Sequence, residues 1–145
     1  MLKNIDPLLN ADLLHVLRAM GHGDELALVD CNFPAISMAM GKPVIRLDGV
    51  GTARAGEAIL SVLPLDTFVE KPVQRMEMVD RPASEMPAVQ LEFEALLKST
   101  NGEGLMGSLE RFAFYEAARN AFAIVITGES RGYGCFMLKK GVIFS

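Results

Sequence analysis

The sequence predicts an α/β fold of three layers, α/β/α, in which helices cover both faces of a largely parallel (mixed) sheet. Strand and helix patterns alternate along most of the chain, which favours parallel strands joined by helices. Residues 26–29 are continuously apolar, as is typical of a strand buried on both faces, and residues 122–127 form a strongly apolar, β-branched strand pattern. Half of the residues are hydrophobic, and a length of 145 residues suits one compact domain over positions 1–145.

The first half of the chain predicts two helices and three strands. Asn10 favours a helix N-cap, leucines follow at helical spacing, and Gly21 ends the helix. Pro34 interrupts the chain after the strand at 26–29, and Pro64 ends the second helix. The other elements expected before residue 70 are a strand over 43–47, a helix over 52–63 and a brief strand over 67–69.

The second half predicts a strand over 73–79, in which Met76 and Met78 alternate with Arg75 and Glu77, and this alternation indicates one solvent-facing side. The prolines of RPASEMPAVQ and the glycines of NGEGLMG indicate loops. The remaining expected elements are helices over 89–98 and 114–121 and strands over 122–127, 135–138 and 142–144. A Lys-Lys-Gly turn between the last two strands predicts an antiparallel hairpin at the sheet edge.

Composition narrows the function classes. A net charge of −4 and a pI near 5.2 argue against nucleic-acid binding and against a polybasic membrane patch. Cys31 and Cys135 lie in unrelated contexts, so we expect neither a zinc site nor a disulfide scaffold. We find no signal-peptide pattern and no apolar run of roughly 18 residues, the length that spans a bilayer. We therefore expect a cytoplasmic protein.

The apolar content predicts assembly. Mean hydropathy is +0.27, and the chain holds nine Met and eight Phe. A small monomer of this composition would expose apolar patches, and a homo-oligomer would bury them.

Several polar residues follow predicted strands, where ligands bind in open α/β sheets. Asp30 ends the first strand, Thr127 and Glu129 lie at the end of the strongest one, and Tyr133 lies just beyond. An ionised Asp30 would accept hydrogen bonds from hydroxyl groups, although capping of the next turn explains it equally well. Tyr133 presents an exposed phenol or simply packs in its loop.

His22 lies between two glycines in the turn before the first strand, at the opposite end from Asp30. An imidazole titrates near pH 6.5 and suits proton transfer, and the glycines leave room for a ligand. The alternative is an exposed histidine after a helix-ending glycine. If His22 has a catalytic role, we expect it to meet the other polar residues across a subunit contact. His15 is expected to be a surface residue.

Three further residues are candidates. Arg111 and Tyr115 are four residues apart and share a face if their helix begins by Arg111; a salt bridge of Arg111 to Glu110 or Glu116 is the alternative. Asp66 follows the helix-ending proline, where a turn role also explains it. The chain lacks a dinucleotide motif and a P-loop, so we expect no cofactor and no metal. This set of side chains suits binding a polyhydroxylated small molecule and moving protons on it.

Six stretches resemble the fucose mutarotase and ribose pyranase family, and the resemblance covers nearly the whole chain, most weakly over 81–109. They are MGHGDE, VDCNFPA, VIRLDGVG, VLPLDTFVE, ERFAFYEAARNAFAIVITGE and YGCFMLKKGV. RFAFYE and LPLDTFVE resemble the fucose branch. The resemblance implies a three-layer fold, a cofactor-free enzyme that interconverts anomers or ring forms of a free monosaccharide, and a ring of subunits, a decamer or octamer, with sites at subunit contacts.

The resemblance also implies roles for individual residues. His22 matches the proton donor, whose counterpart would be Asp66 or a water molecule. Asp30, Arg111 and Tyr133 match sugar-contacting positions, and Tyr115 matches a further functional position. We expect Tyr115 and Cys135 to join these three residues in binding the substrate. Cys135 stands where the family usually has Asn. A thiol is a weaker hydrogen-bonding partner than an amide, so this difference bears on which sugar is preferred more than on the type of reaction.

We therefore expect a mutarotase for L-fucose. The alternatives are a D-ribose pyranase or a mutarotase for another sugar, a non-catalytic sugar-binding accessory of transport, and a structural oligomer in which the histidine is incidental.

Overall fold

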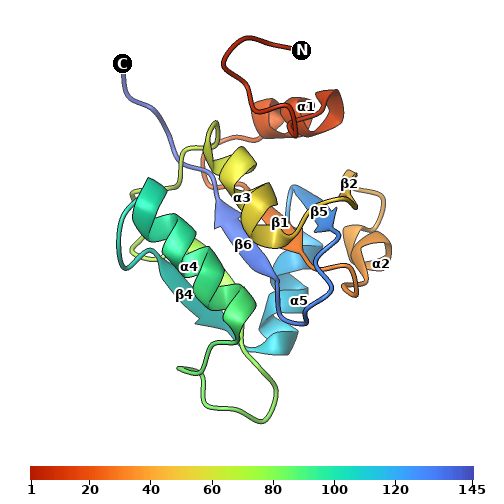
Figure 1. Ribbon diagram of the computed structural model, residues 1–145, viewed down its shortest axis with the longest axis vertical. Helices are drawn as coiled ribbons and strands as arrows, with labels where there is room; N and C mark the ends of the chain where they lie inside the picture. The colour runs from red at the N-terminus through yellow and green to blue at the C-terminus, as the bar shows by residue number, and fades with distance from the viewer.

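The computed structural model describes residues 1–145 and builds one mixed sheet with helices on both faces (Figure 1). The helices are α1 (Ala11–Ala19), α2 (Ala35–Ala39), α3 (Thr52–Leu60), α4 (Ala88–Thr100) and α5 (Arg111–Asn120). The strands are β1 (Glu25–Val29), β2 (Val44–Leu47), β3 (Val73–Met76), β4 (Met106–Leu109), β5 (Ala123–Thr127) and β6 (Phe136–Lys139). None of the helices is both long enough and apolar enough to cross a membrane.

The sheet has the strand order β2-β5-β1-β6-β3-β4. The pairs β2–β5, β5–β1 and β3–β4 are parallel, whereas β6 runs antiparallel to both of its neighbours, β1 and β3. The expected hairpin of the last two strands is wrong, because residues 142–144 form no strand and β6 lies inside the sheet. Residues 128–135 are too few for the crossover that a parallel strand needs, which explains the direction of β6.

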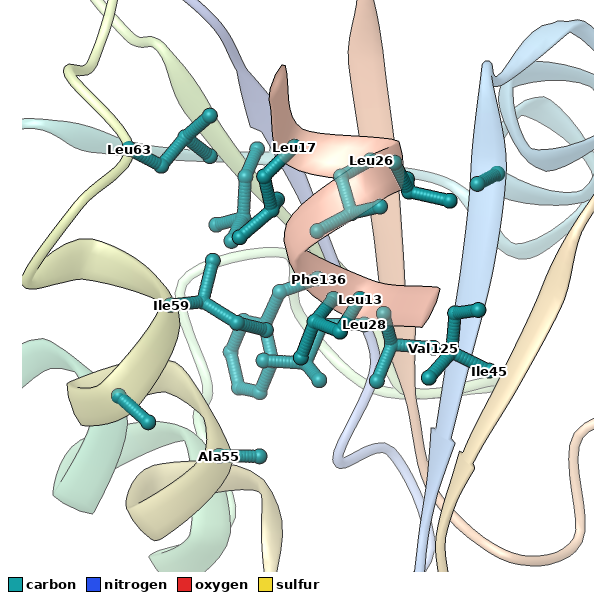
Figure 2. Close-up of a cluster of buried hydrophobic side chains, with 14 of the residues drawn as sticks. Leu13, Leu17, Leu26, Leu28, Ile45, Ala55, Ile59, Leu63, Val125 and Phe136 are labelled. Atoms are coloured by element: carbon teal, nitrogen blue, oxygen red, sulfur yellow. The ribbon is translucent and has the colours of Figure 1, made fainter. Parts of the chain in front are cut away.

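Two apolar layers confirm the three-layer architecture. The larger one packs α1, α3 and α4 on one face of the sheet, and Figure 2 shows Leu13 and Leu17 of α1 and Ile59 of α3 facing side chains of the central strands. The smaller one packs α2 and α5 on the other face. Strand β1 lies between the layers, and its residues alternate between them, so the continuously apolar run at 26–29 is buried on both sides as expected.

Helix α1 begins as predicted and ends differently. The Asn10 side chain accepts the backbone N–H of Leu13 at 2.9 Å, which is the expected N-cap. Gly21 does not adopt the left-handed conformation that commonly ends helices; Gly23, with a φ of 86°, does so two residues later. The Gly21 N–H instead donates to the Asp24 side chain at 2.7 Å. This turn carries His22 at the amino end of β1.

Three short elements differ from expectation. Helix α2 and edge strand β4 were not predicted, because five and four residues are too few to show a clear apolar period. Residues 67–69 form bends and no strand. Asp66 Oδ1 accepts the Phe68 N–H at 3.0 Å, and this side-chain turn replaces strand pairing.

The sequence predicted that Arg75 lies on a solvent-facing side of strand β3, and this prediction is wrong. Arg75 is only 6% exposed, because β3 lies between β6 and β4 and α4 covers its face. The guanidinium donates to Gln90 Oε1 and to the backbone oxygen of Ala83. The strand is also shorter than expected and ends at Met76.

Candidate active site

A pocket of about 300 Å³ opens at the carboxyl end of β1 and gathers the five expected sugar-contacting residues. Asp30 follows β1, Cys135 precedes β6, and α5 supplies Arg111 and Tyr115 from its first turns. The antiparallel direction of β6 places its first residues beside the last residues of β1. The lining residues are Asp30, Asn32, Phe33, Pro34, Met76, Arg111, Tyr115, Gly132, Tyr133 and Cys135.

Asp30 is 4% exposed, and both of its oxygens have a partner. Oδ1 accepts the Asn32 N–H at 3.0 Å, so the turn-capping role coexists with a place in the pocket. Oδ2 lies 3.2 Å from Cys135 Sγ. Burial, reinforced by the negative charge of Asp30, raises the pKa of the Cys135 thiol well above its usual value. The thiol therefore stays protonated and donates to Asp30.

Arg111 faces Tyr115 on one side of α5. Its Nε donates to Tyr115 Oη at 3.1 Å, and its guanidinium lies 5.4 Å from the ring centroid. The hydrogen bond with Tyr115 is the main cause that raises the pKa of Arg111. The alternative of a salt bridge is wrong, because Glu110 caps the helix through the N–H groups of residues 112 and 113, and Glu116 pairs with Arg119. The helix begins at Arg111 because of that cap.

Tyr133 is half-buried and has a φ of 65°, in the left-handed region. Its Oη accepts the Val79 N–H at 3.3 Å, which ties the loop that follows β3 to the rim of the pocket. Its backbone oxygen accepts a hydrogen bond from the Gln90 side chain at 2.9 Å. Tyr133 therefore lines the pocket and does not merely pack within its own loop.

His22 and Asp66 form a second group, at the amino end of β1. His22 Nε2 lies 3.1 Å from Asp66 Oδ1; the His22 side chain is 42% exposed and the Asp66 side chain 5%. The Phe68 N–H, and then His22, lower the pKa of Asp66, so this carboxyl is ionised at neutral pH. The Phe68 ring lies 5.1 Å from the imidazole.

One chain does not unite these two groups. The five residues of β1 separate them, and at roughly 3.3 Å per residue the strand spans about 13 Å, far beyond hydrogen-bond reach. A single sugar in the pocket of Asp30 therefore does not reach His22 of the same chain.

Comparison with known proteins decides the family. Residues 3–143 match the sequence pattern of the RbsD/FucU transport protein family. The chain belongs to the RbsD/FucU family. This membership confirms the resemblance seen in the sequence, and it covers the stretch over 81–109 where that resemblance was weakest.

Several fucose mutarotases are similar to this chain over almost their whole length. The chain is 45% identical to the fucose mutarotase of Homo sapiens, covering 98% of this chain and 94% of that protein. It is 44% identical to the L-fucose mutarotase of Actinobacillus pleuropneumoniae, with 98% and 97% coverage. The solved fucose mutarotase of Streptococcus pneumoniae, in complex with L-fucose, superposes with a TM-score of 0.90 at 37% identity, covering 99% of this chain and 100% of that one.

Other candidates fall outside the pocket of this RbsD/FucU protein. Thr127 Oγ1 donates to the Val29 backbone oxygen at 2.9 Å, and Glu129 pairs with Arg131, so both support the loop structure. His15 is exposed on α1, as expected. No three His, Cys, Asp or Glu side chains cluster as metal ligands.

Sequence reasoning missed the apolar side of the pocket. Phe33 contacts Tyr115 at 5.6 Å between ring centroids, and Met76 lies at the end of β3. Phe33 follows Asp30 by three residues, and that proximity was the available signal. Nothing local in the sequence links Met76 to the pocket.

Proposed function

We propose that this protein is an L-fucose mutarotase, an isomerase that interconverts the anomers of the free sugar by opening and closing its ring. The observation that carries the proposal is the pocket: it gathers Asp30, Arg111, Tyr115 and Tyr133 in a chain similar to fucose mutarotases over nearly its full length. Carboxylate, guanidinium and phenol groups are suitable partners for sugar hydroxyls. Phe33 and Met76 offer an apolar surface to the C–H groups of the ring.

Ring opening requires two proton movements. A base takes the proton of the anomeric hydroxyl, and an acid protonates the ring oxygen as the C–O bond breaks. In our proposal His22 is the acid. Asp66 Oδ1 lies 3.1 Å from Nε2, which leaves Nδ1 for the substrate. A protonated imidazole carries hydrogen on both ring nitrogens, so it can donate from Nε2 to Asp66 and give up the Nδ1 proton to the ring oxygen. Asp66 Oδ1 already contacts both His22 and the Phe68 N–H, which favours a positioning role for Asp66 and a water molecule as the base.

Sites between subunits are part of the proposal. His22 lies at the far end of β1 from the pocket, so His22 of a neighbouring copy would complete the site. The surface around His22 suits a subunit contact: Phe68 is 66% exposed, Phe144 is 76% exposed, and their ring centroids are 6.3 Å apart. A closed ring, a decamer or octamer, would repeat this contact and bury both rings.

A cytoplasmic location and a single domain over residues 1–145 complete the proposal. Both cysteines are free thiols, Cys31 at the surface and Cys135 buried, which agrees with a reducing compartment.

The proposal is tested by NMR saturation exchange between sugar anomers, with and without the protein, across a panel of L-fucose, D-ribose and other monosaccharides. We expect the largest acceleration with L-fucose. Greater acceleration with D-ribose would support the pyranase alternative. Binding without acceleration for any sugar would support a transport accessory, and no binding at all would leave a structural oligomer.

A further inference from the structure

Gln90 joins the centre of the fold to the sugar pocket through its side-chain amide. Gln90 is fully buried near the start of α4. Its Nε2 donates to the backbone oxygens of Met76 at 2.7 Å and of Tyr133 at 2.9 Å, and both residues line the pocket. Its Oε1 accepts from Arg75 Nη1 at 3.1 Å. These three partners use both amide hydrogens and the oxygen, and they fix the orientation of the amide.

Tyr133 needs such a contact because of its backbone conformation. A φ of 65° is unfavourable for a bulky residue and persists where surrounding contacts hold it. The neighbours Gly132 and Gly134 have no side chains to provide contacts. The Tyr133 carbonyl is held by Gln90 on the α4 side of the sheet, and its hydroxyl accepts the Val79 N–H at the surface.

Arg75 extends the connection beyond Gln90. Its guanidinium is buried and bonds both the Gln90 oxygen and the Ala83 backbone oxygen. Ala83 and Val79 belong to the same loop, residues 77–87, which follows β3 and leads into α4 (Figure 1). Tyr133 is therefore tied to this loop twice, once through its hydroxyl and once through Gln90 and Arg75.

We propose that Gln90 is a positioning residue that holds Tyr133 in its left-handed conformation and thereby sets the affinity of the pocket for the sugar; this inference rests on the function proposed above. A sugar hydroxyl bound by Tyr133 is bound in the ground state and in the transition state alike. Loss of the positioning contact therefore raises KM and leaves kcat nearly unchanged.

The test compares Gln90→Met and Gln90→Glu with the parent protein, by NMR exchange rates at several L-fucose concentrations. Methionine keeps the length of the side chain, and glutamate also keeps an acceptor for Arg75, but an ionised glutamate cannot donate to the two carbonyls. We expect both variants to raise KM about five- to tenfold, as loss of a hydrogen bond predicts, with kcat within about twofold. Gln74→Met is the matched control, because the Gln74 amide donates to Lys71 outside the pocket, and it should leave both constants unchanged.

Repeating the Gln90 substitution in the Tyr133→Phe variant distinguishes a positioning role of Gln90 from a general structural role. In Tyr133→Phe the hydroxyl is absent, so adding Gln90→Met should raise KM less than about twofold further, since the two changes act on one contact. Full additivity of the two changes, an unchanged KM in both Gln90 variants, or a melting temperature of both below the assay temperature would each overturn the proposal. Failure of the parent protein to accelerate exchange would instead overturn the proposed function.

Discussion

The thiol of Cys135 donates a hydrogen bond to Asp30 Oδ2 across 3.2 Å, between the end of β1 and the start of β6. The bond leaves each oxygen of Asp30 with one protein partner and room for another. Cys135 therefore supports the carboxylate from within the protein. Sugar contact by Cys135 itself, expected from the sequence, stays a prediction.

The two cysteines should differ sharply in reactivity. Burial raises the pKa of Cys135, whereas Cys31 is exposed. At pH 8, a thiol-alkylating reagent should modify one cysteine of the native protein quickly and the second only after unfolding, because the thiolate is the reactive form. Mass spectrometry after timed labelling measures this. Cys31→Ser is the control and should show no fast phase; fast labelling of that variant would contradict the burial of Cys135.

Removal of the His22 imidazole should abolish most of the catalysis. General acid catalysis contributes about 10²- to 10⁴-fold, so His22→Ala should slow catalysed exchange of L-fucose anomers by that factor. The exposed His15 on α1 provides the matched control, and His15→Ala should exchange at the parent rate. Equal rates for His22→Ala and the parent would remove His22 from the mechanism.

Stability should fall in acid partly because of Glu129. Hydrogen bonds from Arg131 hold the pKa of Glu129 below its usual value of about 4.5. A depressed carboxyl pKa stabilises the folded state above the unfolded pKa, and this contribution disappears as pH falls through the folded value. We expect Glu129→Gln to be less stable than the parent at pH 7 and to lose less stability between pH 5 and pH 3.

Urea unfolding at several pH values checks this expectation. Glu103→Gln makes the same change of charge at an exposed position and should keep the slope of the parent. If Glu129→Gln lost stability in acid as steeply as the parent, Glu129 would not be a source of the pH dependence.

The sequence could predict elements and residues that depend on local patterns. Helix α1 follows from Asn10 and the spacing of its leucines, and the buried strand β1 follows from its apolar run. The separation of His22 from Asp30 follows from their places at the two ends of that strand, and the structure bears it out.

The features that the sequence did not predict depend on contacts between residues far apart in the chain. Whether β6 pairs with residues 142–144 or enters the sheet between β1 and β3 depends on strands far away in the chain. Arg75 looks like a surface residue because its partners, Gln90 and Ala83, lie beyond a loop that carries no regular pattern. No local signal marks Gln90, whose role depends on the fold of three separate segments.

The most direct consequence of the distance between His22 and Asp30 is complementation between subunits. If each site combines His22 of one copy with Asp30 of the next, His22→Ala and Asp30→Asn should each be inactive alone. In a randomly mixed assembly of equal amounts, each site has half a chance of an intact His22 and half a chance of an intact Asp30, so about a quarter of the sites should be whole.

Co-expression of the two variants with different affinity tags, followed by purification through both tags, yields mixed assemblies for NMR exchange with L-fucose. We expect about a quarter of the parent rate. A mixture of separately expressed proteins that do not exchange subunits is the control and should stay inactive. Mixed assemblies without activity would show that each chain supplies both residues to its own site, which would require the turn of His22 to move across the length of β1.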